Sequence, residues 1–208
     1  MDSIKCYIAN STGKLTALIP KIEAAFEESQ KLIVDELGAN QIDVIFIYAP
    51  LATIPEMGVG GNSPDPHNIY VSFDPEFKGI KQSDIVLSVL HEAHHCMRWR
   101  DPGYGKTLGE AMISEGLASL FEEEYSGEAP IYTRIKIKPS EIKAADMLLS
   151  TKAYDHAEWF FGSKDIQRWF GYTYGYQLCK AYSKKVGKNA AELVRTDSRL
   201  FLNSALTK

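Results

Sequence analysis

Two histidines and a glutamate near the middle of the chain have the types and spacing of a metal site. His91, Glu92 and His95 form the pattern H-E-x-x-H within residues 89–96. On an α-helix, residues four positions apart share a face, so the two imidazoles can point at one ion. Glu92 can then take a proton from a water held by that ion, as in zinc hydrolases. The alternative is a helix with two hydrogen-bonded histidines and no metal.

A zinc site with two histidine ligands needs a third protein ligand and an open position for water. Glu115 is the candidate, because it follows His95 by twenty residues. That length allows one helix to end, a loop to reverse the chain, and a second helix over residues 108–125 to return the carboxylate. An ordinary exposed glutamate is the alternative. The apolar neighbours Ile113 and Leu117 argue against it, because burying an unpaired carboxylate is costly.

The remaining histidines are expected to have other roles. His94 lies off the helix face that carries the two candidate ligands, so we expect it to be structural or to support the site. His67 reads as a loop histidine. His156 can serve as a substrate-binding residue, although a position on a helix surface is favoured.

Hydrophobic spacing predicts the elements that position the candidate site. Residues 14–37 are expected to form a long helix that Gly38 ends. Runs of β-branched and aromatic residues predict buried strands at 42–48 and 68–73. Between them, the glycine-rich residues 57–62 form either a short edge strand that a substrate backbone can approach, or a plain turn cluster.

The helix that carries the histidines is expected to begin after Ser83 as its N-cap and to end at residues 101–103. Its apolar side predicts packing on the sheet, which would leave the two candidate ligands facing a cleft.

The other segments give weaker signals. Residues 1–13 show little regular pattern, and residues 131–138 alternate in polarity, which predicts a short exposed strand or an arm over the cleft. Helices are expected over 140–150 and 165–186, followed by terminal helical segments at 188–208.

The length and composition suit a single domain over residues 1–208, with 45% hydrophobic residues available for a core. We expect a helix and sheet in 1–80, the metal-binding helices in 81–128, and a helical C-terminal subdomain in 129–208.

Composition excludes several classes of protein. The net charge of -4 indicates no nucleic-acid partner, and no window approaches the roughly 18 apolar residues of a membrane span. The first residues lack a signal-peptide pattern, and the three cysteines form no C-x-x-C motif. A cytoplasmic protein is therefore expected. The sequence does not indicate an oligomeric state.

The motifs together resemble a known group of enzymes. The two histidines and the distal glutamate resemble the gluzincin branch of zinc metallopeptidases, and more closely the YjaZ-like family of predicted zinc-dependent proteases (domain of unknown function 2268). The similar stretches are 58–61, 90–95, 107–111, 114–118 and 168–176. The resemblance implies a zincin-like fold, with Zn²⁺ on His91, His95 and Glu115 and with Glu92 as the general base.

Two tyrosines are candidates for stabilising the charge that develops on the peptide carbonyl oxygen. Tyr172 and Tyr176 are four residues apart and share a helix face. Tyr172 and Gly175 form a Tyr-x-x-Gly pattern that resembles one found after the ligands in several gluzincins, so Tyr172 is the first candidate and Tyr176 the second. An aromatic core stripe is the alternative.

These features predict an α+β, zincin-like metallopeptidase fold. A small mixed sheet packs on the active-site helix, and the C-terminal part is mostly helical. The expected function is hydrolysis of a peptide or protein substrate with Zn²⁺ as cofactor, which Co²⁺ or Mn²⁺ can replace. The alternatives are a zinc-binding but inactive protein that binds a peptide or protein partner, and a metal-free interaction domain.

Overall fold

The computed structural model describes residues 3–206 and has a mixed α+β fold. The chain divides into two compact units, Met1–Arg100 and Asp101–Lys208, and each is described by itself. The division falls between the two helices that carry the candidate ligands. In the part of the chain that the structure describes, no helix is long and apolar enough to cross a membrane.

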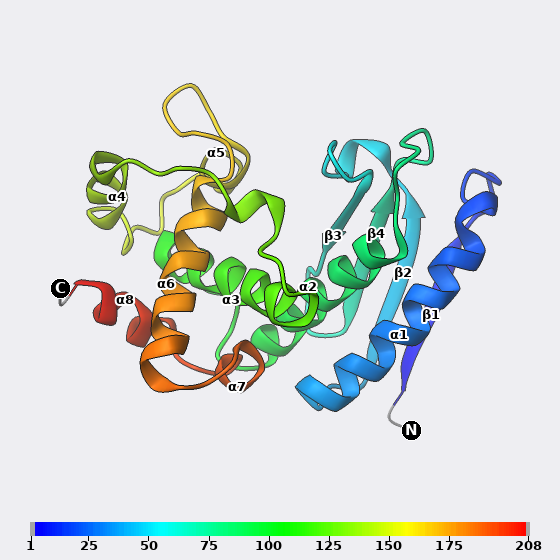
Figure 1. Ribbon diagram of the computed structural model, residues 1–208, viewed down its shortest axis with the longest axis horizontal. Coiled ribbons are helices and arrows are strands. Elements are labelled where there is room, and N and C mark those ends of the chain that lie inside the picture. Colours follow the sequence, from blue (N-terminus) through cyan, green and yellow to red (C-terminus); the bar gives the residue numbers. More distant parts are fainter. Residues whose placement is uncertain (1–2, 207–208) are drawn as a thin grey trace. The chain divides into compact units, whose positions relative to one another are not determined.

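The first unit is built on a four-stranded sheet with the order β1-β2-β4-β3 (Figure 1). The strands are β1 (Ile4–Ala9), β2 (Ile42–Tyr48), β3 (Val59–Asn62) and β4 (Asn68–Phe73). β1, β2 and β4 are parallel, whereas the edge strand β3 runs antiparallel to β4. α1 (Ile19–Leu37), preceded by the short 3₁₀ turn η1 (Thr16–Leu18), connects β1 to β2. A second 3₁₀ turn, η2 (Pro50–Ala52), follows β2.

Alternation along the strands separates a core face of the sheet from a more exposed one. Val44 and Phe46 of β2 pair in register with Ile69 and Val71 of β4, and all four are fully buried. Residues that alternate with them are more exposed, as at Tyr70. α1 contacts α2 (Gln82–Arg100), and α2 also contacts β3 and β4. The two helices therefore pack side by side on the core face (Figure 1).

Most predicted elements of this unit are confirmed. β2 and β4 have the predicted bounds, and α1 ends at Gly38, whose φ of 58° satisfies the left-handed C-cap position. The strand β1 was missed within residues 1–13. Only Ile4 of this strand is buried, and its parallel pairing with β2, a contact distant in sequence, stabilises it.

The start of α2 differs from the prediction. The helix begins at Gln82, so Ser83 lies inside its first turn and is not the N-cap. The carboxylate of Asp84 accepts a hydrogen bond from the backbone amide of Lys81 at 2.9 Å. Asp84 lies in the first turn of the helix. Its side chain therefore stabilises the helix start, which is the role that the sequence assigned to Ser83.

The glycine-rich stretch forms the edge strand β3, as one of the two interpretations expected. Its glycines are required by packing within the first unit. A Cβ at Gly60 would collide with the carbonyl oxygen of Ala52, and a Cβ at Gly61 would lie 2.5 Å from Oε1 of Glu92. Both sites therefore have no space for a side chain, independently of any substrate.

The second unit is organised around two helices that pack closely, α3 (Leu108–Ser126) and α6 (Phe170–Val186). They meet at glycines: a Cβ at Gly116 would collide with the backbone of Gly175, and one at Gly175 with Met112. Figure 1 shows α6 crossing α3. α7 (Ala190–Leu193) and α8 (Ser198–Leu206) also pack against α3.

Two predictions for the second unit are wrong in detail. Residues 131–138 do not form the predicted strand: they contain the 3₁₀ turn η3 (Ile131–Thr133), and Tyr132 and Thr133 are buried. The alternative of an arm over the cleft stays a prediction. The helix predicted from 165 begins only at Phe170, because Trp169 has the left-handed φ of 71°. The predicted helix at 140–150 is confirmed in part as α4 (Pro139–Asp146), and α5 (His156–Phe161) follows it.

Candidate metal centre

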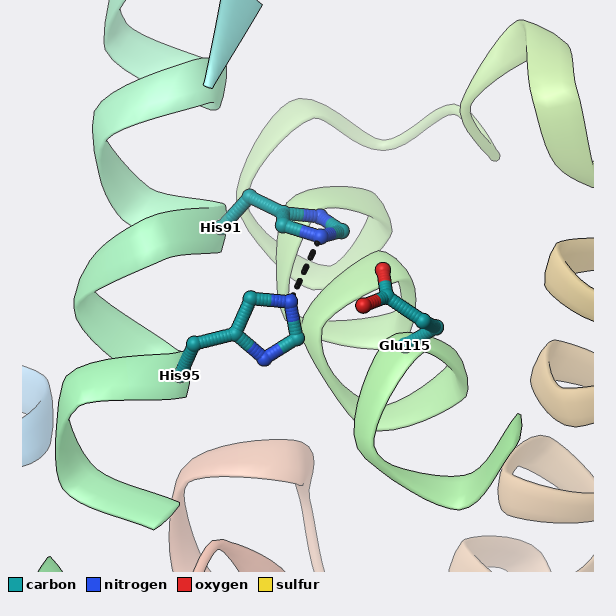
Figure 2. A group of neighbouring side chains, drawn as sticks. All are labelled: His91, His95 and Glu115. Atoms are coloured by element: carbon teal, nitrogen blue, oxygen red, sulfur yellow. Dashed lines mark hydrogen bonds between the residues drawn. The ribbon is translucent and has the colours of Figure 1, made fainter. Parts of the chain in front are cut away.

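Helix α2 holds the two candidate histidine ligands side by side. His91 and His95 lie one turn apart, and both are buried. Their Nε2 atoms are 3.0 Å apart, and the ring centroids are separated by 4.7 Å with an interplanar angle of 82°. Two imidazoles therefore present the same type of nitrogen to one point in space (Figure 2).

Glu115 of α3 completes this group. One ligand atom from each of His91, His95 and Glu115 can be chosen so that all three lie within 4.8 Å of one another (Figure 2). The carboxylate is buried, with 5% of the residue exposed. A carboxylate is expensive to bury unless it is paired or binds a metal. The interpretation of Glu115 as an ordinary exposed glutamate is therefore wrong.

The donor set and spacing suit a zinc ion. Two imidazole nitrogens and a carboxylate oxygen are ligands that zinc accepts, with a fourth position left for water. Nitrogens at about 2.05 Å from a tetrahedral zinc lie about 3.3 Å apart. The observed Nε2 to Nε2 distance of 3.0 Å is close to this value. The two histidines therefore need little movement to bind the ion.

Glu92, the residue after the first histidine, is packed against the edge strand. It is buried, and its carboxylate lies over the backbone of Gly61 in β3. Any side chain at Gly61 would overlap Oε1, Cγ and Cδ of Glu92. The missing side chain at Gly61 thus provides the space that the Glu92 carboxylate occupies.

Sequence reasoning missed Tyr104, which lies in the loop before α3 and contacts a candidate ligand. Its hydroxyl donates a hydrogen bond to Oε1 of Glu115. Burial, followed by the negative charge of Glu115, raises the pKa of Tyr104 well above its ordinary value of 10. The phenol is therefore protonated and serves as a donor. The only signal in the sequence was a tyrosine between two glycines in the connection between the ligand helices.

Aromatic residues of the second unit surround Tyr104 and Tyr172. The pKa of Tyr104 is raised further by its neighbours Tyr172 and Tyr154. The ring of Tyr172 packs on Tyr132 at a centroid distance of 4.9 Å and on Phe160 at 5.0 Å. Tyr172 thus belongs to an aromatic cluster, as its alternative interpretation expected.

The second tyrosine candidate has different neighbours. The hydroxyl of Tyr176 donates to Oε2 of Glu123 at 2.6 Å and accepts a hydrogen bond from Lys180 at 2.8 Å. Glu123 lies eight residues after Glu115, about two turns along α3. This hydroxyl is therefore engaged with an ion pair at the surface of the second unit.

The other histidines lie outside the three-residue metal group. His94 is fully buried in α2, and Nδ1 of His67 is 2.9 Å from the backbone oxygen of Gln41 in the loop before β2. His156 begins α5, where it stacks on Phe160 at 4.2 Å and lies 6.4 Å from the ring of Tyr104.

Comparison with known protein families gives a match to most of the chain. A family model described as "Predicted Zn-dependent protease (DUF2268)" matches residues 19–203, which include the candidate ligands, Glu92 and Tyr104. No curated protein and no solved structure gave a match.

Proposed function

The chain belongs to the DUF2268 family of predicted Zn-dependent proteases, and on this premise we propose that it hydrolyses peptide bonds in a peptide or protein substrate. The proximity of His91, His95 and Glu115 is the observation that carries the proposal. These three residues would hold the zinc, and their combination supports a gluzincin type. The small mixed sheet packed on α2 supports a zincin-like fold.

A bound zinc ion supplies two effects: it polarises the substrate carbonyl and lowers the pKa of a water toward about 7. Glu92 acts as the general base that accepts a proton from the attacking water and passes it to the leaving amine. Its burial against β3 fixes the carboxylate and excludes bulk solvent from one side. Tyr172, with Tyr176 as second candidate, donates a hydrogen bond to the oxygen on which negative charge develops.

A peptide-library digest tests the proposal. The zinc-loaded protein is expected to cleave a subset of peptides. Glu92→Gln keeps the size of the side chain but removes the base, so it should keep one zinc per chain and lose turnover. Cleavage by Glu92→Gln at the wild-type rate would contradict the mechanism. Zinc binding by the wild type without cleavage of any peptide would instead favour the inactive binding protein.

A further inference from the structure

We propose that Tyr104 is a positioning residue for the metal centre: its phenol holds one oxygen of Glu115 so that the other oxygen is directed to the ion. This inference rests on the proposed zinc site. Metal-binding side chains are oriented by hydrogen bonds to their remaining polar atoms, and these partners affect metal affinity. The hydrogen bond from Tyr104 to Oε1 provides such a partner for the carboxylate.

Hydrogen bonds to α3 hold both the backbone and the side chain of Tyr104. Oγ of Ser114 donates a 2.5 Å hydrogen bond to the carbonyl oxygen of Tyr104, while the adjacent Glu115 receives the phenol. Two consecutive residues of α3 thus hold the same tyrosine. Because both the carbonyl oxygen and the hydroxyl of Tyr104 are hydrogen-bonded to α3, the hydroxyl is fixed relative to the carboxylate of Glu115.

The residues after Tyr104 strengthen this attachment. The carboxylate of Glu110 accepts hydrogen bonds from the backbone amides of Lys106 at 2.7 Å and Thr107 at 2.9 Å, which completes a capping box at the start of α3. Gly105 has a φ of 120°, and a Cβ there would collide with Glu110. These contacts hold residues 105–107 against the first turn of α3.

A second phenol and carboxylate on the same helix provides a matched control. Glu122 lies seven residues after Glu115, so it is about two turns away on the same side of α3. Its Oε1 accepts a hydrogen bond from the buried Tyr132. The pair has the chemistry of Tyr104 and Glu115, but Glu122 is not one of the three residues of the metal group.

Zinc affinity, measured by competition with a chelator, tests the inference without relying on activity. Tyr104→Phe should weaken zinc binding by about 10- to 100-fold, the usual effect of removing such a partner. Tyr132→Phe should leave the affinity at the wild-type value. Equal zinc affinity for Tyr104→Phe and wild type would overturn the inference.

A double-variant comparison separates positioning from a general structural role. If Tyr104 acts through Glu115, Tyr104→Phe should have no further effect on the weakened zinc affinity of a Glu115→Ala protein, measured at zinc concentrations high enough to load its two histidines. A loss of the same size in both backgrounds would refute the assignment. If Tyr104→Phe does not fold, Ser114→Ala provides the test. This variant removes the hydrogen bond to the Tyr104 carbonyl oxygen and should reduce the zinc affinity. An unchanged zinc affinity would overturn the inference.

The outcomes also separate this inference from the proposed function. A wild-type protein that binds no zinc contradicts both. A wild type that binds zinc but cleaves no peptide contradicts only the peptidase, provided that Tyr104→Phe still weakens zinc binding.

Discussion

Replacing Gly61 with alanine should displace the carboxylate of Glu92 without altering a proposed metal ligand. The added Cβ would lie 2.5 Å from Oε1 of Glu92, whereas ordinary contact begins at 3.4 Å, so the carboxylate must move by about 0.9 Å. Gly61 does not have a positive φ, and alanine can therefore adopt its backbone conformation. The strand should persist while the base moves.

The size of this displacement determines the expected loss of catalytic rate. A misplacement of about 1 Å in a catalytic group can cost about 10²-fold in rate. That factor corresponds to about 2.7 kcal/mol of activation free energy. We therefore expect Gly61→Ala to lower kcat about 100-fold. Zinc affinity should stay at the wild-type value, because the methyl group contacts Glu92 rather than the imidazoles.

Steady-state kinetics on a cleaved peptide, together with zinc titration, provides the assay. Asn62→Ala is the control, because Asn62 is the next residue of β3 and is exposed. It should keep both kcat and zinc affinity. Wild-type kcat in Gly61→Ala would refute the reasoning that Glu92 is positioned by this strand. A loss of zinc would show that the effect comes from the ligands instead.

Further predictions concern the tyrosines and the start of α3. Tyr172→Phe should lower kcat by about 100-fold, the cost of removing one donor to the oxyanion. If Tyr176→Phe causes this loss instead, the role belongs to Tyr176. Burial tends to raise the pKa of Glu110, but hydrogen bonds from the amides of Lys106 and Thr107 outweigh it and bring the pKa below its ordinary value of 4.5. The ionised carboxylate thus stabilises the fold above about pH 4.5, and this contribution is lost as the pH falls through the lowered pKa. Glu110→Ala should therefore reduce the free energy of unfolding by about 1 kcal/mol at pH 7 and by less at pH 3, measured by urea denaturation. An equal loss at both pH values would contradict this reasoning.

Strong local patterns allowed much of the fold to be predicted from the sequence. The apolar runs of β2 and β4 and the glycine that ends α1 leave few local alternatives. The spacing of His91 and His95 was equally informative, because helical periodicity puts them on one face. The twenty residues from His95 to Glu115 left room for a second helix to return the carboxylate.

Features that depend on contacts between distant residues were not predicted. β1 is stabilised by pairing with β2, more than thirty residues later in the chain. The late start of α6 follows from the left-handed conformation of Trp169, which its residue type does not indicate. The role of Tyr104 depends on how a loop folds back on α3. The position of Tyr104 in the sequence therefore did not indicate that Glu115 is its hydrogen-bond partner.

The most direct test of the central claim is the zinc content and zinc coordination of the purified protein after dialysis against micromolar free zinc. We predict one zinc per chain, with X-ray absorption distances of about 2.0–2.1 Å to imidazole nitrogen and about 2.0–2.2 Å to carboxylate oxygen. His95→Ala and Glu115→Ala should each lose most of this zinc. A folded wild type without bound zinc, or a Glu115→Ala protein with unchanged zinc content and coordination, would contradict the three-residue site.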